Sequence, residues 1–180
     1  DLLAAWRTLQ HEQREFLRAQ EARLADLPAL AGLLRRMSMK TTARNQFAGV
    51  VQALDLGPAS ATVTIALKSG DEIVATMTAD AAKRLKLRKG KEALALVKAS
   101  AVVLVADFAG WQLSARNQLA GTVSRIERGA VSSLVALTLP GGMTLTASVT
   151  NEGVEALDLK VGAAATAVFK AYAVMVAAQP

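Results

Sequence analysis

A pentapeptide that combines a hydroxyl residue, an alanine and an arginine occurs twice in this chain of 180 residues. The first copy is Thr42-Ala43-Arg44-Asn45-Gln46, and the second is Ser114-Ala115-Arg116-Asn117-Gln118. Arginine presents a rigid fork of donors that suits tetrahedral oxyanions. Hydroxyl and free backbone N–H groups complete such a shell, and a small alanine lets the anion approach the main chain. Each pentapeptide is therefore a candidate oxyanion-binding motif.

A lysine follows each pentapeptide at the same distance. Lys98-Ala99 comes after the first copy, and Lys170-Ala171 comes after the second. Either lysine would add a second positive charge to the site. The residues alone leave a structural alternative open, in which Arg44 and Arg116 only hold their own strands by donating to backbone carbonyls.

The pentapeptides belong to a longer internal repeat. A shift of 72 residues aligns Thr42–Phe108 with Ser114–Pro180 without a gap. Glycines recur at matching positions along the two copies, namely Gly49 and Gly121, Gly57 and Gly129, Gly70 and Gly142, and Gly90 and Gly162. An ungapped match of this length indicates a duplicated structural module.

Each module reads as a series of short strands with one helical turn. In the first copy, period-two patterns and turn residues predict strands at 47–54, 62–67, 73–77, 93–97 and 102–105. Thr78 is the expected N-cap of a short helix over 81–85. The fold class that we predict is mainly β, with two tandem five-stranded barrels of the OB type preceded by a helical segment. The predicted domains are residues 1–40, 41–110 and 111–180.

Residues 1–40 have a different pattern from the two modules. Leu2, Trp6, Leu9, Gln13, Phe16 and Gln20 follow one another at steps of four and three residues, which predicts a helical stripe ended by Pro28. This helix either packs on its own barrel or pairs with a second copy, and we expect the dimer. The start at Asp1 also suggests a fragment of a longer chain.

Composition narrows the classes of function. The net charge is +6, and the chain has no cysteine and one histidine, His11, without metal-ligand neighbours. No enzyme motif is present, so we predict neither catalysis nor a metal site nor a cofactor. Apolar runs are too short to cross a membrane, and the expected location is the cytoplasm. The basic charge admits nucleic acid, but aromatic residues for base stacking are only 4% of the chain.

Several other residues are interpreted as structural. Asn45 and Gln46 are expected to form turn or interdomain hydrogen bonds, and Gly49 and Gly121 to permit bending or close packing of strands. Trp6 and Trp111 are interpreted as packing residues. A run of basic residues is expected to form a solvated face. It comprises Lys83, Lys86, Arg88, Lys89 and Lys91.

The repeated [S/T]-A-R-N-Q motif, the downstream glycines and the Lys-Ala pair resemble the Mop or molbindin module, which is TOBE-like. Two such modules behind a helical segment resemble the molybdate-sensing half of ModE-type transcriptional regulators. This resemblance implies paired OB-like barrels, a homodimer, and molybdate or tungstate bound at subunit interfaces. DNA would be bound only through an upstream domain that is absent from this chain, and no membrane is involved.

The resemblance also implies a primary site built from two subunits. One subunit would supply Thr42, Ala43, Arg44, Lys98 and Ala99, and its partner would supply Thr78, Ala81 and Arg84. The chain departs from the family pattern at Thr42, where serine is usual, and at Ala81, where a hydroxyl residue is expected. A weaker secondary site is implied at Ser114, Ala115, Arg116, Thr150, Lys170 and Ala171, where Ala156 replaces the counterpart of Arg84.

Three functions remain to be distinguished. The leading hypothesis is the ligand-sensing part of a molybdate-dependent transcriptional regulator. The alternative is a molbindin-type protein that stores or buffers molybdate, and it would need no helical segment over residues 1–27. A nucleic-acid-binding barrel is the third, and the scarcity of aromatic residues disfavours it.

Overall fold

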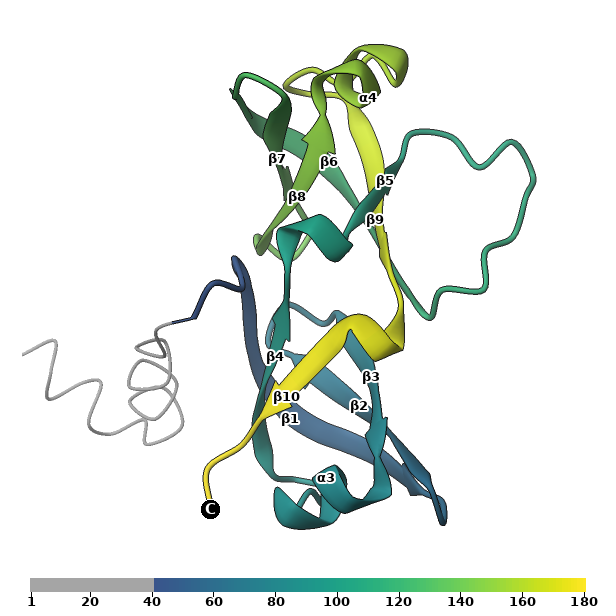
Figure 1. Ribbon diagram of the computed structural model, residues 1–180, viewed down its shortest axis with the longest axis vertical. Helices are drawn as coiled ribbons and strands as arrows, with labels where there is room; N and C mark the ends of the chain where they lie inside the picture. Colours follow the sequence, from purple (N-terminus) through teal and green to yellow (C-terminus); the bar gives the residue numbers. More distant parts are fainter. Residues whose placement is uncertain (1–40) are drawn as a thin grey trace, which may run out of the picture. The chain divides into compact units, whose positions relative to one another are not determined.

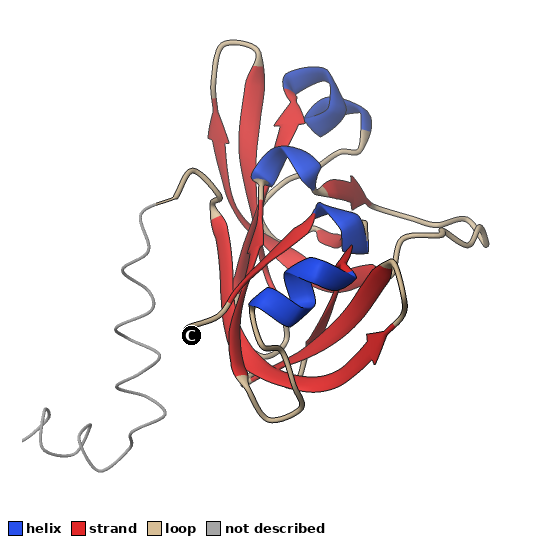
Figure 2. Cartoon of the chain, turned by 60° about the horizontal axis from the view of Figure 1, so that its bottom comes forward, coloured by secondary structure: helices blue, strands red, loops and turns tan. Residues whose placement is uncertain are grey.

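The computed structural model describes residues 41–180, and the predicted helical segment over residues 1–40 lies outside the described residues. The described part is mainly β, with two five-stranded antiparallel sheets (Figure 1). Helical segments are short beside the long strands (Figure 2). The predicted fold class, mainly β with OB-like five-stranded units, is confirmed for this part of the chain.

The two sequence repeats fold into the same series of elements. The first comprises β1 (Asn45–Leu56), β2 (Ser60–Leu67), β3 (Glu72–Thr78), α3 (Ala79–Arg84), β4 (Glu92–Val97), the 3-10 turn η1 (Ala99–Ala101) and β5 (Val103–Val105). The second comprises β6 (Asn117–Arg128), β7 (Ser132–Thr138), β8 (Thr144–Thr150), α4 (Asn151–Ala156), β9 (Ala164–Phe169), η2 (Ala171–Ala173) and β10 (Val174–Ala177). Because corresponding elements lie 72 residues apart, the structure confirms the duplication.

Alternating burial explains why these residues form strands. In β2, Ala61, Val63, Ile65 and Leu67 are buried, while the residues between them are half-buried. Successive side chains of a strand point to opposite faces, so this period-two pattern places one face in the core. The β-branched residues that dominate β2 also suit a pleated, half-buried surface.

The fifth strand of each sheet comes from the other repeat. The strand order is β10-β4-β1-β2-β3 in the first sheet and β5-β9-β6-β7-β8 in the second. Val174 of β10 pairs with Val97 of β4, and Val103 of β5 pairs with Val168 of β9. The division that we predict between residues 110 and 111 follows the sequence repeat, and each sheet takes its fifth strand from across that division.

The exchanged strands complete both barrels. β10 also approaches β3 at the far edge of the first sheet, and β5 approaches β8 in the second, so both sheets curl toward closure. Val174 and Leu104, which belong to the exchanged strands, are buried in an apolar cluster that runs continuously through both barrels. The two repeats therefore share one core.

Close strand contacts account for two of the recurring glycines. A Cβ atom on Gly49 would overlap the carbonyl oxygen of Ala66 and the side chain of Ile65 on β2. At Gly121 it would lie 2.8 Å from the carbonyl oxygen of Thr138 on β7. The expectation that these glycines permit close packing is confirmed, since real Cβ atoms do not fit at such distances.

Two asparagines of the pentapeptides join the barrels. Asn45, on β1, donates from Nδ2 to the carbonyl oxygen of Thr146 (2.8 Å) and accepts from the backbone N–H of Thr146 at Oδ1 (2.7 Å). Asn117, on β6, makes the equivalent pair of bonds with Val74, both 2.8 Å long. The predicted interdomain role of Asn45 is confirmed. Gln46 bonds locally, donating to the carbonyl oxygen of Ala43 at 3.4 Å.

The connector between the repeats runs from β5 to β6 without regular secondary structure, over residues 106–116 (Figure 1). Asp107 accepts the backbone N–H of Ala109 at 2.8 Å, which stabilises a local turn. Trp111 lies in this connector and is 79% exposed. The interpretation of Trp111 as a packing residue is therefore wrong, because its sequence neighbours belong to neither barrel sheet.

Candidate functional site

The first pentapeptide enters β1 with its two polar site residues exposed. Thr42 and Arg44 lie at the surface, and Ala43 between them is 2% exposed. Arg44 forms no ion pair with any residue in the range 41–180. The backbone N–H of Ala43 donates to the hydroxyl of Thr41 at 3.2 Å. This amide is therefore already bonded, whereas the sequence pattern had suggested that it would be free for a ligand.

The β1–β4 ladder brings the lysine to the pentapeptide. Asn45, the first residue of β1, pairs with Val97, the last residue of β4. In an antiparallel pair the residue before Asn45 lies beside the residue after Val97. Arg44 and Lys98 thus both lie just beyond the last pair of the ladder, and Lys98 is exposed while Ala99 is buried. Two nearby cations with no anionic partner among residues 41–180 favour the binding of an anion.

The other predicted residues of the primary site surround α3. Thr78 is the N-cap of this helix, and its Oγ1 accepts the backbone N–H of Ala81 at 3.2 Å, as the sequence predicted. Thr78 and Arg84 are exposed, and Ala81 is half-buried. Arg84, in the last turn, forms no ion pair with any of the described residues.

These two groups of residues lie at opposite ends of the first barrel. Thr78 pairs with Ser60, beside the C-terminal end of β1, whereas Arg44 precedes its N-terminal end. Figure 1 shows α3 and the start of β1 far apart. The 12 residues between them, at about 3.3 Å each, are too long for one small anion to bridge. Within one chain, the structure therefore unites Thr42, Ala43, Arg44, Lys98 and Ala99 and separates them from Thr78, Ala81 and Arg84.

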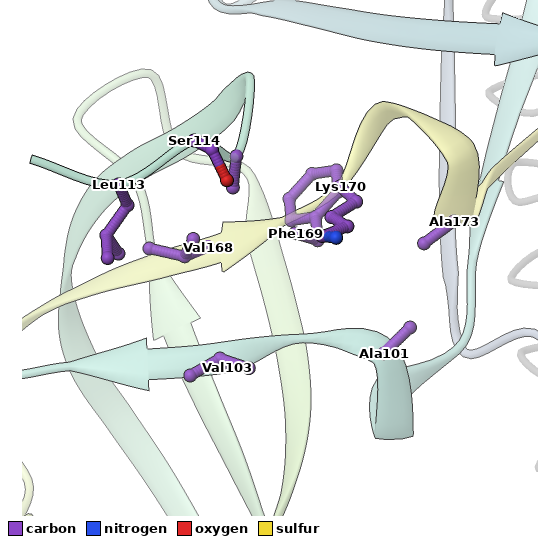
Figure 3. A pocket seen from close by; sticks show the side chains of 9 residues that line it. Ala101, Val103, Leu113, Ser114, Val168, Phe169, Lys170 and Ala173 are labelled. Carbon is purple, nitrogen blue, oxygen red and sulfur yellow. The ribbon is translucent and has the colours of Figure 1, made fainter.

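The second repeat builds the same arrangement with different surroundings. Asn117 pairs with Phe169, so Ser114-Ala115-Arg116 lies beside Lys170-Ala171. An open pocket of about 480 Å³ lies here, lined by Ala101, Val103, Leu113, Ser114, Ala115, Val168, Phe169, Lys170 and Ala173 (Figure 3). Its walls are mainly apolar side chains, and Val103 comes from the exchanged strand β5. Sequence reasoning missed these walls, because nothing in the repeat pattern signals the strand exchange.

The helix of the second repeat keeps the cap but lacks the cation. Thr150 Oγ1 accepts the backbone N–H of Gly153 at 3.1 Å, as Thr78 does in the first repeat. Ala156 ends α4 where Arg84 ends α3. The second repeat thus keeps the hydroxyl groups, Arg116 and Lys170, but has Ala156 at the position that corresponds to Arg84.

The barrel end that carries α3 and the barrel end that carries α4 also differ in charge. Around α3, five exposed cations form no ion pair with the described residues, namely Lys83, Arg84, Lys86, Arg88 and Lys89. At the α4 end, Arg128 lies 3.4 Å from Glu155, and Lys160 lies 2.9 Å from Asp158. The expected solvated face is confirmed for the first four lysines and arginines of the run, while Lys91 is half-buried and donates to the carbonyl oxygen of Leu85. An approaching anion is attracted to the α3 end more than to the α4 end.

Among residues 41–180, no group of three or more His, Asp, Glu or Cys residues is arranged to hold a metal ion. Within that range, too, no helix is long and apolar enough to cross a membrane.

Comparison with known proteins places these features in a family. The TOBE domain model matches residues 41–104 and again residues 113–176. A molybdenum transport protein ModE from Herbaspirillum seropedicae is 68% identical over 179 residues, which cover 99% of this chain and 66% of the relative. ModE from Azotobacter vinelandii is 41% identical over 98% of this chain and 67% of that protein. The chain thus spans about two thirds of the length of these curated relatives.

A solved structure of similar fold supports the assignment. The cytoplasmic molybdate-binding protein ModG, in a form with molybdate bound, is 48% identical with a TM-score of 0.77. The match covers 78% of this chain and all of the ModG chain. Two matches to the domain model, the relatives and the common fold agree: the chain belongs to the TOBE-domain family and carries two tandem copies of that domain.

Proposed function

We propose that this chain is the molybdate- or tungstate-binding, ligand-sensing part of a molybdate-dependent transcriptional regulator. The observation that carries the proposal is the half-site at the start of β1. There Arg44 and Lys98 lie beside each other without an anionic partner among the described residues, next to the Thr42 hydroxyl and two buried alanines. The chemistry that we propose is binding, since these groups can hold and neutralise an oxyanion.

The names of similar proteins support the choice of ligand. ModG is described as molybdate-binding and ModE from Escherichia coli as a DNA-binding transcriptional dual regulator, the latter 38% identical over 178 residues. DNA recognition would belong to the part of such relatives that this chain does not span. Storage of molybdate is the second candidate. The molybdate-binding protein ModG aligns over its whole length with 78% of this chain, so a protein without the rest of the chain can still bind molybdate. The ModE relative aligns with 99% of this chain, and this wider match favours the sensor function over storage.

We further propose that the complete site forms between two subunits of a homodimer in the cytoplasm. Arg44 and Arg84 lie at opposite ends of one barrel, so a second subunit must supply the α3 group. An anion bound by both subunits would couple ligand occupancy to their relative orientation, which is what a sensor requires.

Titration calorimetry tests the binding function. The chain is expected to bind molybdate with about one anion per chain at the primary site, because only the first repeat keeps both arginines. Tungstate should behave similarly, and sulfate and phosphate serve as controls for general attraction to a basic surface. An absence of binding heat with both molybdate and tungstate would show that the proposed function is wrong.

A pair of variants tests the intersubunit arrangement. Arg44→Ala and Arg84→Ala should each abolish tight molybdate binding in their homodimers. When the two variants are co-expressed and isolated through different affinity tags, each mixed dimer should bind one anion rather than two. One site then joins the intact Arg44 of one chain to the intact Arg84 of the other. No recovery in the mixed dimer would place both arginines in a site within one chain.

A further inference from the structure

We infer that Asn45 is a positioning residue for the oxyanion half-site, which it holds in place by binding the edge strand of the opposite barrel. This inference rests on the proposed function and concerns how that site is built. Asn45 follows Arg44 directly, and its side chain is only 2% exposed. The Nδ2 and Oδ1 atoms of its side chain both form hydrogen bonds with one residue, Thr146, which is 101 positions away in the chain.

The bonds of Asn45 imitate those of a neighbouring strand. Thr146 lies in β8, at the edge of the second sheet, where backbone groups on the outer side have no strand partner. The Nδ2 and Oδ1 atoms of Asn45 meet the carbonyl oxygen and N–H of Thr146 at 2.8 and 2.7 Å. When the N–H and the carbonyl oxygen of a buried side-chain amide are both hydrogen-bonded, the side chain has one orientation. The backbone of Asn45 is held in place with its side chain.

Both arms of the half-site rest on the same strand of the other barrel. The arm that contains Ala43 and Arg44 is tied to β8 through Asn45. The arm that contains Lys98 leads into η1, and η1 packs against β8. Val97, which precedes Lys98, pairs with Asn45 on one side and with Val174 of the exchanged β10 on the other. The geometry between Arg44 and Lys98 therefore depends on the second repeat.

The second repeat supplies a matched internal control. Asn117 is equally buried, at 2%, and its two bonds to Val74 on β3 have the same form and are both 2.8 Å long. It follows Arg116, so it positions the secondary set and not the primary one. Thr78 follows Val74 on β3, but it is held independently by its pairing with Ser60 on β2. Loss of Asn117 therefore leaves the surroundings of both Arg44 and Thr78 in place.

The experiment compares Asn45→Ala with Asn117→Ala by calorimetry with molybdate and by thermal melting. Both variants should lose a similar few degrees of melting temperature, because each loses two buried hydrogen bonds. Asn45→Ala should weaken binding at the primary site at least tenfold, whereas Asn117→Ala should change it less than threefold. Equal weakening in the two variants, or none in Asn45→Ala, would overturn the inference. A wild-type chain that binds no molybdate would instead overturn the proposed function.

A second pair of variants approaches the same bond from the other barrel. Thr146→Pro removes the N–H that Asn45 accepts, and β8 is an edge strand, where proline is tolerated. Ser148→Pro is the control on the same strand and the same outward side. Thr146→Pro should weaken molybdate binding at least fivefold, and should add little when combined with Asn45→Ala. If Asn45→Ala does not fold, an equal effect of the two proline variants would overturn the inference.

Discussion

Replacing Arg44 with alanine is expected to weaken molybdate binding at least about 100-fold, which corresponds to about 3 kcal/mol. Arg44 is the cation at the entry to β1, and no described carboxylate neutralises it. Removing one partner of a desolvated charge pair costs on the order of 2–5 kcal/mol, because the remaining charge loses its counterpart. Calorimetric titration of the variant with molybdate measures this loss directly.

Arg116→Ala is the matched control for this prediction. Arg116 occupies the same position in the second repeat, beside Lys170, but its helix ends in Ala156 instead of an arginine. We expect the high-affinity binding of this variant to remain within about threefold of the wild type, or about 0.7 kcal/mol. The opposite ranking of the two variants would show that the second repeat carries the stronger site.

Deleting residues 174–180 is expected to unfold the first barrel, although its other four strands lie 77 or more positions earlier in the chain. The deletion removes β10, and with it the buried Val174 and the partly buried Val176. Full burial of a valine side chain contributes about 1.5–3 kcal/mol, and the partly buried Val176 adds a smaller amount. The β10–β4 ladder is lost as well, and a typical domain has only about 5–15 kcal/mol of stability. Circular dichroism and chemical denaturation would follow the loss.

A shorter deletion separates this effect from a general effect of truncation. Removing only Gln179 and Pro180, which are exposed and follow β10, should leave the stability and the molybdate affinity unchanged. If the chain that ends at Ala173 still melts cooperatively at the wild-type temperature, then β10 is not needed to complete the first barrel.

The sequence predicted the strands well because their signals are local. Alternation in β2, the Thr78 cap and the paired glycines each act over a few residues, and the repeat allowed every element to be read twice. That Arg44 and Lys98 lie close together could also be predicted, because these residues border strands that pair with each other. The role of Trp111 was predicted wrongly, since hydrophobicity alone does not reveal that a residue lies in a connector.

The exchange of β5 and β10 could not be read from the repeat. The last strands of the two repeats, β5 and β10, occupy equivalent positions in the repeat. Judged from local sequence alone, either strand could supply the hydrogen bonds and apolar contacts that complete a barrel. The path of the chain after η1 and η2 decides which barrel each strand joins. Contacts between the barrels accompany that path, including the bonds of Asn45 to Thr146 and of Asn117 to Val74.

By itself, the sequence determined that the chain contains a duplicated β module, that each copy carries the same arginine-containing pentapeptide, and that the first copy is richer in cations. These properties depend on residue type and spacing alone. Only the tertiary structure decided that Arg44 and Arg84 lie at opposite ends of one barrel, and that each half-site is supported by strands of the other repeat. The reason is that such contacts join residues far apart in the chain, where local periodicity carries no information.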